Sequence, residues 1–131
     1  MSQELYEKGI KKIQEFTRSH SKDMPTGEME IGEAYAELAP DLPRYVVEFA
    51  FGEIYSRAGL DNKQKVLVTI SSLVSQGMPQ IAIHINSGLN VGLTPEEIVG
   101  AIVHLLPYTG FPKVLNALNV AKKIFEERDQ K

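Results

Sequence analysis

Residues 94–110 read TPEEIVGAIVHLLPYTG and contain the clearest helix start in the chain. Thr94 offers an N-cap hydroxyl, Pro95 takes the first helical position, and Glu97 stands three residues after the cap, which together form a capping box. Pro107 is expected to kink or end this helix, because proline lacks a backbone N–H. Its buried face is predicted from apolar residues at helical spacing, which are Ile98, Ala101, Ile102 and Leu105.

Helical periodicity extends to both sides of this stretch. Apolar residues fall three or four apart in further predicted helices, at about 3–18, 28–38, 45–59, 61–77 and 79–92. Segment 61–77 is rich in residues that also favour strands, but its length of about 16 residues decides for a helix. A last helix follows Pro112 and should turn inward Val114, Leu115, Leu118, Ala121 and Phe125. The sequence therefore predicts an all-α fold of six or seven helices.

The chain of 131 residues has the length of one ordinary domain. A polar stretch from Ser19 to Gly27, which contains Pro25, is expected to be a loop. It would separate residues 1–27, a helix and loop acting as an arm or cover, from a helical domain at 28–131. Several helices look apolar over more than one face, which is more apolar surface than a chain this short can bury. We therefore expect an oligomer that buries the surplus between subunits.

Composition and charge exclude several classes of function. The formal charge of -3, with scattered lysines, argues against a nucleic-acid partner, which would need a concentrated basic surface. No run approaches the roughly 18 uncharged apolar residues of a membrane span, and the N-terminus lacks the apolar centre of a signal peptide. We expect a cytoplasmic protein without a membrane partner. The chain has no cysteine, so thiolate catalysis and cysteine-ligated metal are impossible.

Two of the three histidines lie in apolar helical segments. His84 could carry a proton near neutral pH, although a histidine in such a face is often a core residue bonded to one backbone carbonyl. His104 more often packs, and Tyr108, four residues later, could add a hydroxyl donor. His20 lies in the polar loop, and no H-E-x-x-H or comparable cluster occurs. We therefore expect no metal site and no cofactor.

Glu53 and Arg57 are four residues apart in the segment FAFGEIYSR. If this segment is helical, the two side chains share a face and can pair or jointly bind a polar ligand. A surface ion pair is the ordinary explanation, but charge among aromatic and apolar residues is costly unless it is well bonded or used. Arg57 could hold a substrate carboxylate through two parallel hydrogen bonds.

Four stretches, in order, resemble the carboxymuconolactone decarboxylase family. They lie between Phe51 and Ala121 and read FGEIYSRAGLDNKQKVLVTIS, IAIHINSGLNVGLTPEEI, HLLPYTGFP and KVLNALNVA. The resemblance covers more than half of the chain. It implies a compact all-helical subunit of the alkylhydroperoxidase D-like kind, which assembles into trimers or hexamers with sites near subunit contacts. The family includes decarboxylases of a ring lactone from aromatic catabolism and related alkylhydroperoxidases.

The resemblance also assigns roles to particular positions. His84 fits the histidine of the alkylhydroperoxidase redox centre, but its two cysteine positions fall at about Gly77 and Gln80, so thiol peroxidase chemistry cannot be inherited. The lactone decarboxylases usually carry acids at two positions that here hold Gln80 and, approximately, Val66. The leading hypothesis is a cofactor-free lyase or isomerase acting on a small anionic lactone or related acid.

In this hypothesis His84 moves the proton and Glu53 orients or tunes the catalytic groups. Arg57 holds a carboxylate, and His104, Tyr108 and Gln80 complete the predicted substrate-binding set. The alternative is a non-catalytic helical oligomer that binds a small molecule or another protein. Peroxide reduction ranks last, because it would need an external thiol or a bound cofactor.

Overall fold

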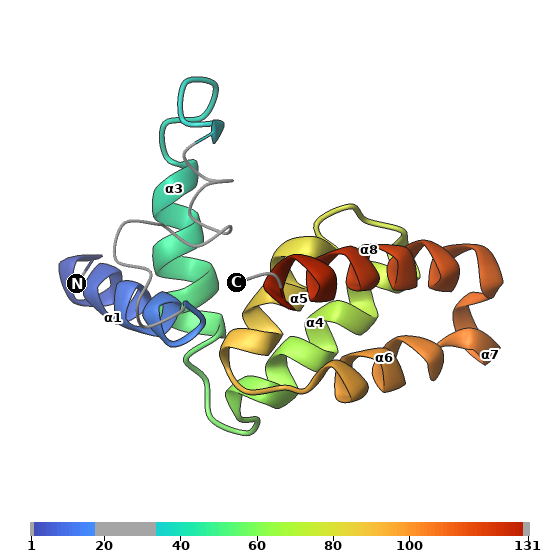
Figure 1. Cartoon of the computed structure of the whole chain (residues 1–131). Coiled ribbons are helices and arrows are strands. Elements are labelled where there is room, and N and C mark those ends of the chain that lie inside the picture. The colour runs from blue at the N-terminus through green and yellow to red at the C-terminus, as the bar shows by residue number, and fades with distance from the viewer. Residues whose placement is uncertain (1, 18–33, 130–131) are drawn as a thin grey trace. The chain divides into compact units, whose positions relative to one another are not determined.

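The structure is a computed structural model that describes residues 2–17 and 34–129. Within these two ranges it consists of helices and turns without a strand, which confirms the predicted all-α fold (Figure 1). The chain divides into two compact units, Met1–Asp61 and Asn62–Lys131. The predicted boundary between residues 27 and 28, and most of the predicted helix at 28–38, lie outside the described residues and stay predictions.

The first unit contains α1 (Ser2–Glu15), the one-turn helix α3 (Leu42–Arg44) and η1 (Tyr45–Ile54). Helix α1 packs against η1, and the two are drawn in blue and blue-green in Figure 1. The apolar stripe predicted for the first helix is confirmed at the C-terminal end of α1, where the side chains of Ile13 and Phe16 are buried. The core of this unit comprises Ile13, Phe16, Val47 and Phe51.

Two glycines allow α1 and η1 to approach closely. A Cβ atom at Gly9 would overlap the backbone carbonyl of Val47, and one at Gly52 would lie 2.9 Å from the carbonyl oxygen of Leu5. Both contacts are with backbone atoms, which cannot move aside as a flexible side chain can. The glycines therefore act by the absence of a side chain, which lets the two helix backbones touch.

Helix η1 is a π-helix, a form that usually occurs as a single turn inside an α-helix. At its end the N–H of Tyr55 donates to the carbonyl of Ala50 at 2.7 Å, and the Ser56 hydroxyl donates to the carbonyl of Phe51 at 2.6 Å. These bonds satisfy two carbonyls near the C-terminal end of the helix. The helix thus ends at Ile54, several residues before the predicted stop at Gly59, which instead has a positive φ of 114° in the connection that follows.

An aromatic cluster closes the core of the first unit. The rings of Phe51 and Tyr55 stack with centroids 4.4 Å apart, and Phe16 meets both of them edge-on at 6.1 and 5.3 Å. Offset stacking and edge-to-face contacts are the arrangements that aromatic quadrupoles favour. The C-terminal end of α1 is thereby anchored to η1.

The second unit contains α4 (Asn62–Gln76), α5 (Ile81–Asn90), α6 (Pro95–Val103), α7 (Leu106–Thr109) and α8 (Phe111–Asp129). Helix α5 packs against α4 and α8, and α6 packs against the same two helices (Figure 1). The core is almost entirely aliphatic. Its buried side chains are Val66, Ile70, Val74, Ile81, Ile85, Leu93, Ile98, Ile102, Val114, Ala117, Ala121 and Ile124.

The predicted start of α6 is confirmed in atomic detail. The Thr94 hydroxyl accepts from the Glu97 N–H at 3.0 Å, and the Glu97 carboxylate accepts from the Thr94 N–H at 2.9 Å. The helix ends at Val103, and Pro107 lies in the first turn of the separate helix α7, as its missing N–H allows. Gly92 has a φ of 104° between α5 and α6, a conformation that glycine adopts without steric cost.

The inward face predicted for the last helix is wrong at Leu115, which is 53% exposed. The buried positions of α8 recur three or four apart, and Leu115 lies one residue, or about 100°, from this stripe.

Among the helices of residues 2–17 and 34–129, none has both the length and the apolar character that crossing a membrane requires.

Candidate functional site

Helix α5 places His84 within its core-facing side. Ile81 and Ile85 are buried next to it along the helix, and Gly88, one turn later, packs against the side chains of Leu93 and Val66. The His84 side chain is half-buried, and its Nδ1 atom is buried. The imidazole therefore has apolar neighbours on its own helix and is not sealed from solvent, which is the environment the sequence predicts for a proton carrier.

Gln80 lies one turn before His84, at the N-cap of α5. Its side chain is exposed and makes no capping hydrogen bond. Val66, at the other position where an acid is usual, is buried in the core of the second unit. A carboxylate at Val66 would carry a high desolvation cost there, so this chain uses the position for packing.

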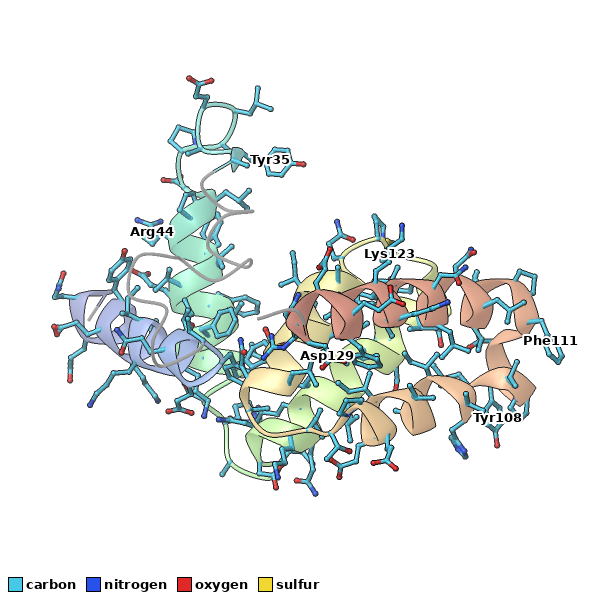
Figure 2. The ribbon with its side chains drawn as sticks, viewed as in Figure 1. Tyr35, Arg44, Tyr108, Phe111, Lys123 and Asp129 are labelled. Atoms are coloured by element: carbon cyan, nitrogen blue, oxygen red, sulfur yellow. The ribbon has the colours of Figure 1, made fainter. Side chains whose placement is uncertain are left out.

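His104 and Tyr108 lie close together in the second unit. Their ring centroids are 6.0 Å apart with an interplanar angle of 50°, and both side chains are exposed. His104 follows the end of α6, and Tyr108 belongs to α7. Figure 2 shows Tyr108 and Phe111, which is also exposed, at the same end of this unit. The structure thus brings together two of the predicted binding residues, on the surface.

Glu53 and Arg57 belong to the first unit, and both are exposed. Glu53 lies in the last turn of η1, whereas Arg57 comes after the helix has ended at Ile54. The backbone N–H of Arg57 donates to the carbonyl of Ile54 at 3.1 Å, within the turn that follows the helix. The shared helical face that suggested a joint role for the two residues is therefore absent.

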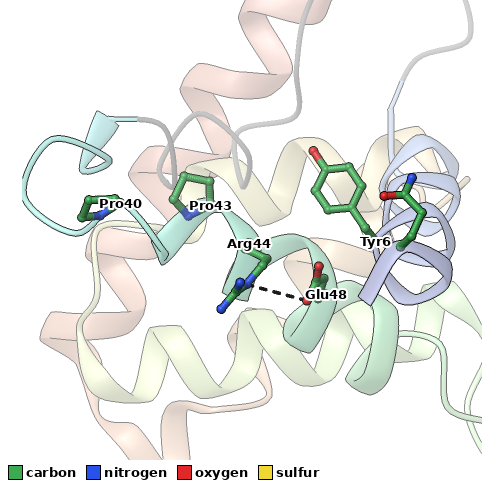
Figure 3. A pocket seen from close by; sticks show the side chains of 6 residues that line it. Tyr6, Pro40, Pro43, Arg44 and Glu48 are labelled. Carbon is green, nitrogen blue, oxygen red and sulfur yellow. Dashed lines mark ion pairs between the residues drawn. The ribbon is translucent and has the colours of Figure 1, made fainter. Parts of the chain in front are cut away.

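The first unit also has an open pocket of about 430 Å³ that contains none of the predicted site residues (Figure 3). Arg44 and Glu48, one helical turn apart, form a loose ion pair across 3.9 Å, and the Arg44 guanidinium also lies 5.7 Å from the centre of the Tyr45 ring. The i,i+4 spacing of Arg44 and Glu48 was the signal in the sequence that could have drawn attention to them. The pocket is lined by Gln3, Tyr6, Pro40, Pro43, Arg44 and Glu48.

A polar link joins α8 to the helix that carries His84. The Arg128 guanidinium donates from Nη1 to the side-chain oxygen of Asn86 at 2.9 Å and from Nη2 to that of Asn90 at 3.0 Å. The amide nitrogen of Asn86 donates in turn to the carbonyl of Ala82 at 3.2 Å. All of these side chains are partly buried. Sequence reasoning missed this link, because arginine near a chain end is most often a solvated surface residue.

A family model and several known proteins match the sequence of this chain. Residues 40–123 match the model of the carboxymuconolactone decarboxylase family, which is more than half of the chain. The chain belongs to this family. The matched range contains all six predicted site residues, whereas all of α1 and residues 124–129 of α8 lie outside it.

Three relatives illustrate the range of the family. The chain is 29% identical over 131 residues to an uncharacterised 15.0 kDa protein from the nqo9–nqo10 intergenic region of Paracoccus denitrificans, covering 98% of this chain and 96% of that protein. It is 32% identical over 88 residues to the 4-carboxymuconolactone decarboxylase of Acinetobacter baylyi, covering 66% of each chain. It is 31% identical over 83 residues to the nitrosuccinic acid decarboxylase of Metarhizium robertsii, covering 63% of this chain and 58% of that protein. The chain thus spans less than two thirds of either decarboxylase.

Among the described residues, no group of three or more histidine, aspartate or glutamate side chains could hold a metal ion. Of the two histidines in the described residues, His84 has a buried ring nitrogen and a half-buried side chain, whereas His104 is exposed.

Proposed function

We propose that the protein is a decarboxylase of a small organic acid and that His84 transfers the proton. The observation that supports this most is the half-buried imidazole of His84 on the apolar face of α5, within the matched family range. Two relatives with named activities are both decarboxylases, of 4-carboxymuconolactone and of nitrosuccinic acid. A lactone or a related acid with an electron-accepting group is therefore the proposed substrate class.

The reaction needs one proton and no oxidant. The bond between the carboxylate and the adjacent carbon breaks, carbon dioxide leaves, and the electron pair moves into a conjugated acceptor such as a lactone carbonyl. The protonated His84 imidazole then donates a proton to the resulting enolate, and solvent restores the proton to the ring. Apolar neighbours such as Ile81 and Ile85 favour the step, because loss of carboxylate charge is easier in a site of low polarity.

The other predicted residues keep their roles as parts of this proposal. Arg57 would hold a substrate carboxylate, and Glu53 would orient or tune the charged groups of the site. Gln80, His104 and Tyr108 would supply neutral hydrogen-bonding groups. We further propose a cytoplasmic homo-oligomer, a trimer or hexamer, that buries exposed apolar side chains and serves the breakdown of aromatic compounds.

The proposal is tested by incubating the wild-type protein with 4-carboxymuconolactone and, separately, with nitrosuccinic acid. Ultraviolet absorbance follows loss of the acid, and a coupled assay measures the carbon dioxide released. We expect His84→Gln to reduce kcat by at least about 100-fold, the typical contribution of a positioned proton donor. A matched control is Lys122→Gln on the exposed side of α8, which should retain wild-type rates. Equal rates for wild type and His84→Gln would remove His84 from the mechanism.

The second candidate function is binding without turnover. It is favoured by Gln80 and by the buried Val66, because neither can supply the acid that the family's lactone decarboxylases usually carry at these positions. Calorimetric titration with the same two acids distinguishes the candidates. Binding with no carbon dioxide released would support the binding function, and the effect of His84→Gln would then be on affinity alone.

A further inference from the structure

We infer that Arg128 is a positioning residue, which sets the orientation of His84 by clamping the opposite side of α5. This inference rests on the role proposed for His84. It begins from the two hydrogen bonds that the Arg128 guanidinium donates to Asn86 and Asn90. Arg128 lies in the last turn of α8, outside the range matched by the family model.

The geometry of α5 explains why its orientation needs fixing. The helix has ten residues, and its N-cap, Gln80, makes no side-chain capping bond. Its core-facing side, with Ile81, Ile85 and Gly88, packs closely against the core of the second unit, but these apolar contacts are non-directional.

The two hydrogen bonds from Arg128 to Asn86 and Asn90, called the Arg128 clamp below, are directional contacts. Asn86 and Asn90 are four residues apart, so their side chains lie one above the other on the helix. Successive residues are about 100° apart, which places Asn86 roughly 200° around the helix from His84. A planar guanidinium that bonds both amides at 2.9 and 3.0 Å fixes the rotation of α5 and its position along its axis.

The clamp also reaches the turn that contains His84. The Asn86 side chain, held by Arg128, donates to the carbonyl of Ala82 at 3.2 Å, two residues before His84. A displacement of the clamp would therefore be passed to the backbone of the first turn of α5. An error of about 1 Å in the position of a reacting group can cost on the order of 100-fold in rate.

The test uses Arg128→Lys, which keeps the charge but presents a single ammonium that cannot bridge two amides in the same planar geometry. The primary measurement is the imidazole nuclear magnetic resonance spectrum of the folded full-length protein, in which the His84 signals are assigned from their loss in His84→Gln. We expect the His84 ring signals to shift in Arg128→Lys. Unchanged His84 signals would overturn the inference whether or not the protein has any activity.

Two controls separate positioning from general destabilisation. Val114→Ala removes buried volume near the other end of α8 and should lower the melting temperature while leaving the His84 signals in place. Lys123→Gln, on the exposed side of the same helix and labelled in Figure 2, should alter neither. Equal displacement of the His84 signals by Val114→Ala would also overturn the inference, because the effect would then be one of packing.

The kinetic readout is independent of the spectrum. If the wild-type protein releases carbon dioxide from either test acid, Arg128→Lys should lower kcat by on the order of tenfold and change KM less than twofold, because the clamp orients a reacting group and does not touch substrate. An increase in KM at constant kcat would contradict the positioning role. Absence of turnover in the wild type would refute the proposed decarboxylase and leave the spectroscopic test of the clamp intact.

Discussion

The two units of the chain are stabilised in different ways. The second unit buries aliphatic side chains from α4, α5, α6 and α8, and the helix boundaries there follow from local signals such as the Thr94 capping box. The first unit relies on an aromatic cluster and on Gly9 and Gly52, which let helix backbones touch. One unit is therefore specified by many separate side chains, and the other by a few positions where no side chain fits.

This difference predicts how each unit tolerates change. A core of many aliphatic residues loses stability in proportion to the volume removed, and it can partly relax around the loss. A backbone contact at a glycine cannot relax in this way, so adding a single methyl group should matter there. Four substitutions test this difference between the two units.

The largest effect is expected for Ile70→Ala in α4. Ile70 is fully buried, and its truncation removes three carbon atoms from the aliphatic core. Such changes typically cost about 2–5 kcal/mol in the free energy of unfolding. Urea denaturation followed by far-ultraviolet circular dichroism measures the loss. The control is Val68→Ala on the exposed side of the same helix, and equal losses in both variants would show that α4 does not face the core as described.

The next largest effect is expected for Gly9→Ala in α1. The added Cβ would overlap the Val47 carbonyl, so α1 and η1 must separate, at a cost of about 1–3 kcal/mol. The same denaturation experiment measures it, with Lys8→Ala at the exposed neighbouring position as control. If Gly9→Ala unfolds with the same free energy as wild type, the two units do not differ in the way proposed.

A smaller loss is expected for Thr94→Ala, which removes the hydroxyl that caps α6. Loss of an N-cap of this kind costs about 1 kcal/mol. Thr94→Ser keeps the hydroxyl and should retain most of the stability. Thermal denaturation of the two variants measures the difference, and an equal decrease in both would assign the effect to the lost methyl group.

The smallest effect, and one of opposite sign, is expected for Gly100→Ala in α6. A Cβ atom at Gly100 would meet nothing within 4 Å, and glycine in a helix interior is about 0.5–1 kcal/mol less favourable than alanine. The variant should therefore be more stable than wild type by chemical denaturation. A loss of stability would indicate that this exposed side of α6 is covered by a partner in solution.

Much of the second unit could be predicted from the sequence, because its signals are local. Thr94, Pro95 and Glu97 define a helix start by short-range hydrogen bonds, and Gly92 marks a positive φ. The π-helical geometry of η1 could not be predicted, because the run from Tyr45 has the composition of an ordinary buried helix. The role of Gly9 could not be predicted from its neighbours in the sequence, because it depends on the contact with Val47, nearly forty positions away.

The candidate site was predictable to a similar degree. His84 could be placed on an apolar helical face from spacing alone, and the structure leaves its ring half-buried there. The prediction that Glu53 and Arg57 share a helical face is wrong, because it assumed that α-helical spacing continues past Ile54. The Arg128 clamp joins residues 38 and 42 positions apart, a separation at which sequence patterns carry no information about contact.

The stacked pair Phe51 and Tyr55 has a practical consequence for spectroscopy. The chain contains no tryptophan, so its near-ultraviolet circular dichroism comes mainly from tyrosine, with weaker phenylalanine bands. Tyr6, Tyr35, Tyr45 and Tyr108 are exposed, whereas Tyr55 is held between two aromatic rings in an asymmetric environment. Ellipticity near 280 nm, roughly where tyrosine absorbs, should therefore report tertiary order around Tyr55, while the amide bands report both units together.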